Sequence, residues 1–201
     1  MQKFMRAIAA IMLTVAVVCT AGCTKDPNEE SEPTTEGIYL GVIGFNNKLY
    51  PKNIGLLDNS TLQSYNSFID DLSMADNTKL YYADYTALQQ LKSYGEPPKL
   101  TNVALVTFTD GLDNASLASS SNPENYASTE DYIASINNKI KTNKIHGYNI
   151  SAYSIGLRGN DVNDNMIEQF RGDLRMLASN DNNVFEVASM NEALERFSEI
   201  A

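Results

Sequence analysis

The sequence predicts an α/β fold, namely a three-layer, mostly parallel sheet with helices on both faces and an N-terminal β-hairpin. Short apolar runs alternate with amphipathic segments along the C-terminal half of the chain. The run from Val103 to Phe108 is apolar at nearly every position, which is typical of a strand buried on both faces of a sheet. Residues 37–201 provide enough chain for one such domain.

The hairpin is predicted at the start of this domain. Ile38 to Phe45 has the composition of a strand, Asn46-Asn47 is a favourable tight-turn pair, and a second strand runs from Lys48 to about Leu57. A helix follows, because Asp58 to Thr61 supplies capping residues and apolar side chains then recur at helical spacing. Its apolar face comprises Leu62, Tyr65, Phe68, Ile69 and Leu72.

The remaining elements alternate between helix and strand. A helix from Tyr81 to Tyr94 ends at the turn Gly95-Glu96-Pro97-Pro98. We expect after it a strand over 103–108, a helix over 129–142, a strand over 150–155, a helix over 166–177, a strand over 184–187 and a helix over 190–200. Such alternation places parallel strands next to one another, with the helices as crossovers.

The N-terminus reads as a targeting signal. Lys3 and Arg6 precede the apolar run Ala7 to Val18, which is too short to cross a bilayer as a helix. Ala21 and Gly22 then stand before Cys23, as in the lipobox of bacterial lipoproteins, although Thr20 occupies a position where that motif usually has leucine. We therefore predict a lipoprotein signal peptide over 1–22 and lipidation of Cys23, with palmitate among the acyl chains. The alternative is an ordinary secretory signal cut near Ala21, which leaves a free thiol.

Residues 23–36 are predicted to be the lipidated cysteine and an acidic tether. Thr24 to Glu36 holds five acidic residues and two prolines but no apolar side chain, so it has nothing to bury. The formal net charge is −10, and removal of the signal makes it about −12, which argues against nucleic acid as a partner. We expect an outer-membrane lipoprotein of the cell envelope, held by its lipid and facing either the cell surface or the periplasm.

Three segments carry a resemblance to a known family. Asn77 to Ala83 reads NTKLYYA, Leu105 to Gly111 reads LVTFTDG, and Tyr148 to Leu157 reads YNISAYSIGL. Together they resemble the von Willebrand factor A (vWA) domain, as found in lipoproteins of Bacteroides-type bacteria. In that family, a threonine ahead of a helix and the aspartate of a strand-terminal TDG contribute to a metal-ion-dependent adhesion site.

The resemblance implies specific ligands in this chain. Thr78 and Asp110 match the two family positions, and Asn46 and Asp113 are candidate auxiliary ligands. The cofactor implied is Mg²⁺ or another divalent cation, because hydroxyl and carboxylate oxygens are the ligands that such hard cations prefer. From the residues alone, Thr78 is equally well explained as a helix cap, and Asp110 as a turn carboxylate bonded to nearby amides.

The family's first motif, Asp-x-Ser-x-Ser after its first strand, has no intact counterpart here. In one alignment, the segment Val42 to Lys48 is a decayed version of it, with Gly44, Asn46 and Lys48 in place of the three ligands. In the alignment that we prefer, the same segment is the family's second strand, because too few residues separate Leu72 from Asn77 to hold another hairpin. The signal and tether then stand where the first strand would be.

These observations predict a membrane-tethered, non-enzymatic protein-binding module, for adhesion or scaffolding, with an incomplete metal site. Its expected partner is an envelope or extracellular protein. The alternative is a metal-assisted envelope enzyme or assembly factor that uses Asp110, Asp113 and the Asp161 to Asp164 loop. A third interpretation is a domain left with an incomplete sheet. Enzymatic activity is not expected, because no nucleophile elbow, P-loop, dinucleotide fingerprint or histidine-rich zinc motif occurs.

Overall fold

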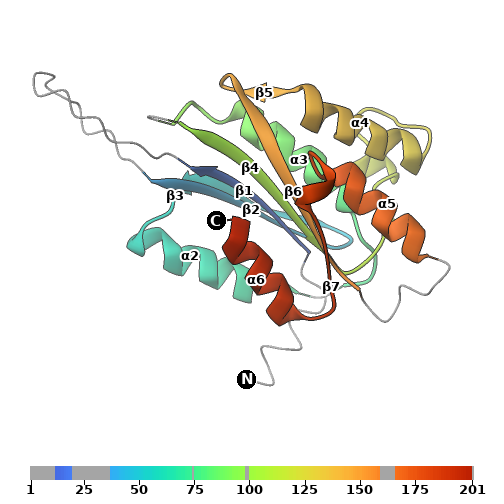
Figure 1. The fold of residues 1–201 in the computed structure, drawn as a ribbon, viewed down its shortest axis with the longest axis horizontal. Coiled ribbons are helices and arrows are strands. Elements are labelled where there is room, and N and C mark those ends of the chain that lie inside the picture. Colours follow the sequence, from blue (N-terminus) through green and yellow to red (C-terminus); the bar gives the residue numbers. More distant parts are fainter. Residues whose placement is uncertain (1–11, 20–36, 74, 98–99, 159–165, 201) are drawn as a thin grey trace, which may run out of the picture.

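The computed structural model describes residues 12–19, 37–73, 75–97, 100–158 and 166–200. For residues 12–19 only the backbone is described. The strands are β1 (Met12–Cys19), β2 (Ile38–Phe45), β3 (Leu49–Leu56), β4 (Asn102–Thr109), β5 (Lys144–Ile145), β6 (Tyr148–Leu157) and β7 (Val184–Val187). The α-helices are α2 (Asn59–Asp70), α3 (Leu80–Ser93), α4 (Thr129–Thr142), α5 (Ile167–Leu177) and α6 (Met190–Ile200). The sheet forms the middle layer, with α3, α4 and α5 on one face and α2 and α6 on the other (Figure 1).

The strands follow the order β3-β2-β1-β4-β6-β5, and β7 also pairs with β6. β4 and β6 are parallel, as are β6 and β7. β2 runs in the same direction as these three, because β1 is antiparallel to both β2 and β4. The predicted α/β class is confirmed, with helices on both faces and the hairpin β2–β3 at its N-terminal side.

One strand was not expected from the sequence. β1 consists of residues from the apolar part of the predicted signal peptide, and it lies between β2 and β4. Its register places Val15 opposite Val42 on one side and Val106 on the other. β2 is therefore separated from β4 by β1. This separation is expected if Ile38 to Phe45 corresponds to the family's second strand and not to its first.

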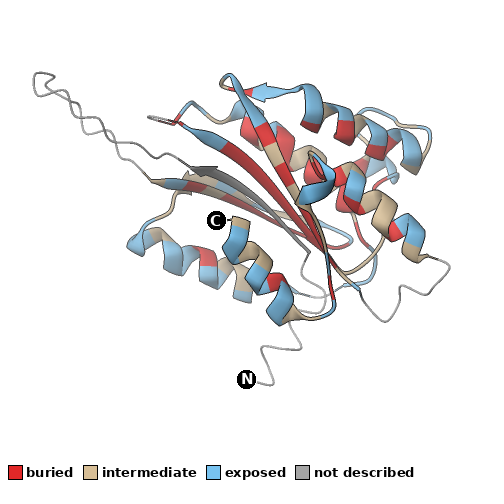
Figure 2. Ribbon diagram, viewed as in Figure 1, coloured by how far each residue is buried: buried red, intermediate tan, exposed pale blue. Residues whose placement is uncertain are grey.

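The core fills both spaces between sheet and helices. Alternate residues of β4 point to opposite faces, so Val103 and Leu105 pack with α3 and α4, whereas Val106 and Phe108 pack with α6. β4 and the middle of β6 are accordingly buried along most of their length (Figure 2). This double burial explains why the sequence of β4 is a continuous apolar run and not an alternating one.

The local signals in the sequence agree closely with the observed elements. Asp58 caps α2 as expected, since its carboxylate accepts hydrogen bonds from the backbone N–H groups of Ser60 and Thr61, each at 2.8 Å. Leu62 was expected on the buried face of α2 but is 47% exposed. The short strand β5 was missed; it joins β6 through His146 and Gly147, whose φ angles of 49° and 88° form a tight hairpin turn.

Among the described residues, no helix has both the length and the apolar character needed to span a membrane.

Candidate functional site

Three loops meet at one end of the sheet, where β2 and β4 end and α3 begins. The backbone N–H of Lys79 donates to the carbonyl of Asn46 at 3.0 Å, which joins the end of the hairpin to the start of α3. The N–H of Thr78 donates to Oδ1 of Asn114 at 2.7 Å. The carbonyl of Thr78 accepts from the N–H groups of Asn114 and Ala115, both at 3.1 Å. Thr78 thus links the loop before α3 to the loop after β4.

The predicted ligand Asn46 lies in this junction and is 4% exposed. Its side-chain amide donates from Nδ2 to the carbonyl of Ser73 at 2.9 Å. Its Oδ1 accepts from the N–H of Lys48, also at 2.9 Å. Both ends of this side chain therefore hold the hairpin turn in place against the segment that follows α2.

Asp113, the other auxiliary candidate, caps α3 although it lies far from this helix in the sequence. Its Oδ1 accepts from the backbone N–H of Tyr81 at 3.3 Å and from the hydroxyl of Ser116. Ser116 in turn accepts from the N–H of Tyr82 at 3.0 Å. The first turn of a helix has unpaired N–H groups that need such acceptors, and α3 has no side-chain cap at Lys79, its N-cap residue.

Burial governs the electrostatics of Asp113. Removal from water raises the pKa of its carboxyl, while the hydrogen bonds from Ser116 and from the Tyr81 backbone act in the opposite direction. Its Oδ2 also accepts from the backbone N–H of Ser116 at 3.3 Å. Each carboxylate oxygen thus has a donor within the protein, which fits a structural role in positioning the loop.

The two candidates matched by family resemblance lie at the same junction. Asp110 is half-buried and directly follows β4, in a turn where the hydroxyl of Thr109 donates to the carbonyl of Gly111 at 2.8 Å. Thr78 is 8% exposed, and its hydroxyl makes no hydrogen bond to any residue that the structure describes. The hydroxyl does not cap α3, so the helix-cap explanation of Thr78 is wrong.

A further carboxylate near this end, that of Asp173, was not anticipated from the sequence. The Tyr81 hydroxyl donates to Oδ2 of Asp173, in α5, at 2.9 Å. Burial is the main cause that raises the pKa of Asp173 from 3.8 to about 6, and the carboxylates of Asp113 and Glu130 add to this rise. Burial also raises the pKa of the Tyr81 phenol, which keeps it protonated as a donor. Asp173 lies within an amphipathic helix, where no motif marks it.

A buried polar pair fixes α3 over the centre of the sheet. The hydroxyl of Thr107, in β4, donates to Oδ1 of Asp84, in α3, at 2.8 Å, and both residues are fully buried. This bond holds the side of α3 against β4, the strand that Asp110 follows. Together with the caps, it sets the position of the junction relative to the sheet.

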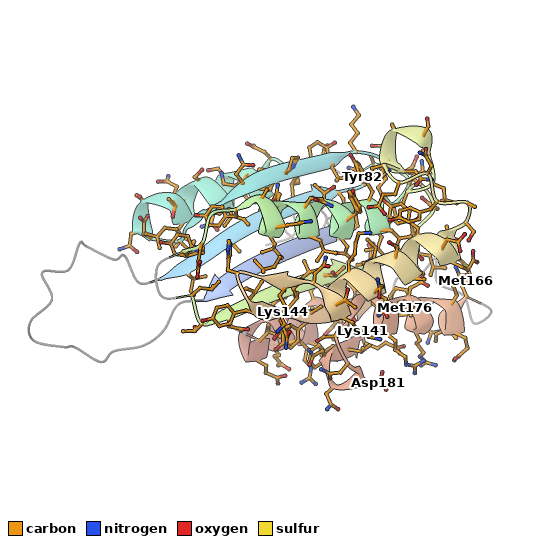
Figure 3. The ribbon with its side chains drawn as sticks, turned by 90° about the horizontal axis from the view of Figure 1, so that it is seen from above. Tyr82, Lys141, Lys144, Met166, Met176 and Asp181 are labelled. Atoms are coloured by element: carbon orange, nitrogen blue, oxygen red, sulfur yellow. The ribbon has the colours of Figure 1, made fainter. Side chains whose placement is uncertain are left out.

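Within the described part of the chain, no group of three or more histidine, cysteine, aspartate or glutamate side chains is placed to hold a metal ion. The Asp161 to Asp164 loop and Cys23, both of which were predicted to have roles, lie outside the described residues. Figure 3 shows Tyr82, from the first turn of α3, at the same end of the molecule as Met166, which precedes α5, while Lys144 lies toward the other end.

Comparisons of the chain with protein-family models, with curated proteins and with solved structures find no significant match.

Replacing Ser116 with alanine tests the distant cap. The change leaves the N–H of Tyr82 without its acceptor and removes one of the two donors to Oδ1 of Asp113, so we expect a loss of about 1–3 kcal/mol in the free energy of unfolding. Urea denaturation followed by circular dichroism measures it. The matched control is Ser119→Ala at an exposed position, where we expect a change within about 0.5 kcal/mol. Equal effects of the two changes would contradict the cap.

Replacing Asp173 with asparagine tests the raised pKa. A folded-state pKa above 3.8 means that the protonated form of Asp173 stabilises the folded state. This stabilisation is fully present below about pH 3.8 and is lost as the pH rises to about 6. The amide side chain of the variant retains an oxygen that can accept from the Tyr81 hydroxyl. We expect Asp173→Asn to gain about 1–2 kcal/mol relative to the original chain between pH 4 and 6, and no more above that range. A pH-independent difference in urea unfolding would disprove the assignment.

Proposed function

We propose that this protein is an envelope lipoprotein whose domain, of vWA type, binds another protein at the end of the sheet where Asn46, Thr78 and Asp110 lie. The observation that carries the proposal is the set of hydrogen bonds through Thr78, Lys79 and Asn114 that joins three loops at this end of the sheet. Lipid on Cys23 and the tether over 24–36 would present that surface away from the membrane.

The proposed mode of action is binding without chemistry on the partner. Asp113 and Asn46 already use their polar atoms to hold the loops, so they contribute to shape. Thr78 and Asp110 are the two residues whose hydroxyl and carboxylate the family resemblance assigns to a cation. Mg²⁺ needs near-octahedral coordination by oxygen, and these two residues supply only part of it. The remaining ligands would come from water and from a carboxylate of the partner.

Aromatic side chains in the first turn of α3 and in the loop that leads to α4 support a protein partner. Tyr82 is half-buried in the first turn of α3, at the end of the sheet that carries the loops (Figure 3). Tyr126 lies in the loop before α4, and its ring stacks on that of Tyr132 with the centroids 4.3 Å apart. A tyrosine that is already held in place loses little side-chain entropy on binding, and tyrosine is enriched in protein interfaces.

The lipid anchor is tested by labelling cells that produce the chain with radioactive or alkyne-bearing palmitate. We expect the label on the original chain, a mass that begins at Cys23, and loss of both in Cys23→Ser, because lipidation precedes cleavage in lipoproteins. Cys19→Ser is the control, since this cysteine lies within the predicted signal and should leave the labelling unchanged. An unlabelled chain cut near Ala21 would indicate an ordinary secretory signal instead.

Calorimetric titration with Mg²⁺, Mn²⁺ and Ca²⁺ tests the incomplete metal site. For the full chain alone we expect no binding in the micromolar range, because Thr78 and Asp110 leave most coordination positions to water. Asp110→Asn and Thr78→Ala should then give the same heats as the original chain. Stoichiometric micromolar binding that disappears in Asp110→Asn would contradict the proposal and favour the metal-assisted enzyme or assembly factor.

A further inference from the structure

The position of β1 defines a slot for one strand between β2 and β4. β1 pairs with β2 over all eight of its residues and with β4 over Leu13 to Cys19. Without β1, β2 and β4 would stand roughly 10 Å apart, which is twice the spacing of neighbouring strands. The facing edges would then each present a row of unpaired N–H and C=O groups.

The walls of the slot are apolar on both faces. Opposite the middle of β1, Val42 and Val106 are 1% and 2% exposed, and the next residues along, Ile43 and Leu105, are 1% and 0% exposed. Successive residues of a strand point to opposite faces, so both layers beside the slot are hydrophobic. α3 lies against β1 on one of these faces and contributes an apolar side to it.

β2 is held in place by contacts that do not involve β1. The hydroxyl of Tyr65, in α2, donates to the carbonyl of Leu40. The carbonyl of Asn46 is bonded to the N–H of Lys79 at the start of α3, and Ile43 packs in the same core cluster as the buried residues of α3. Closing the slot by pairing β2 directly with β4 would break these contacts. We therefore expect the slot to stay open when β1 leaves it.

We propose that the processed protein binds an apolar β-strand of a partner protein in the slot between β2 and β4. This inference rests on the proposed function, because cleavage before Cys23 removes Met12–Cys19 from the sheet. The occupant is a segment of about eight residues with apolar side chains on both of its faces, as in MLTVAVVC, the sequence of β1. Backbone hydrogen bonds to both edges supply the affinity, and the apolar walls select the side chains.

The test uses the processed chain purified from the membranes of producing cells, with its N-terminus established by mass spectrometry. The probe is a synthetic peptide of residues 12–19 that carries Cys19→Ser and lysines at both ends for solubility. We expect saturable one-to-one binding by fluorescence anisotropy and a rise of several degrees in the midpoint of thermal unfolding. The control is the same peptide with Val15→Pro, which removes a backbone donor in the middle of the ladder and should not bind.

The outcomes separate the slot from the proposed function. Binding of the first peptide but not of the proline peptide supports the slot. The slot is overturned by any of three results: equal binding of both peptides, no binding of either, or dimerisation of the chain in place of binding. In each case a mass that begins at a lipidated Cys23 still supports the proposed lipoprotein. A purified chain that retains residues 12–19 overturns both, because β1 then occupies the slot permanently.

Discussion

The facing edges of β2 and β4 impose the constraint on which the rest of the structure depends. Both strands run in the same direction, both are buried, and the backbone of each is paired through β1. A buried N–H or C=O group that loses its partner costs free energy on the order of 1–3 kcal/mol. The facing edges of β2 and β4 therefore need either a strand between them or water on their backbone groups. The segment that lies between them in the full chain belongs to the predicted signal peptide. Under the proposed processing at Cys23, export of the protein and completion of its sheet would be coupled, because cleavage would change what lies between two central strands.

The helix α3 connects this slot to the proposed binding surface. Its side packs against β1, and its Asp84 accepts a hydrogen bond from Thr107 of β4. Its first turn is held by Asp113 and Ser116 from the loop that follows β4. A strand that enters or leaves the slot therefore contacts the same helix whose N-terminal end joins the three loops. Two binding events, one at the sheet end and one in the slot, would share α3 as their common element.

Much of the fold was predictable because its signals are local. The cap at Asp58, the hairpin around Asn46 and the apolar run of β4 depend on residues that are close in sequence, and the structure agrees with all three. The distant contacts left no such signal. Asp113 caps a helix whose first turn lies more than thirty residues earlier in the chain, and Asp173 of α5 accepts a hydrogen bond from Tyr81 of α3. Neither role can be inferred from the spacing of residues along the sequence. β1 was missed for another reason, since an apolar signal segment and a buried strand have the same composition.

We propose that β2 and β4 depend on a strand that processing at Cys23 removes. Amide hydrogen exchange followed by mass spectrometry tests it directly, with the processed chain compared with the unprocessed Cys23→Ser chain in the same detergent. We expect residues 38–45 and 102–109 to exchange much faster in the processed chain, while β6, which is paired with β7, keeps most of its protection. Equal protection of β2 and β4 in the two chains would contradict it, because their edges would then be satisfied without β1 or any partner strand.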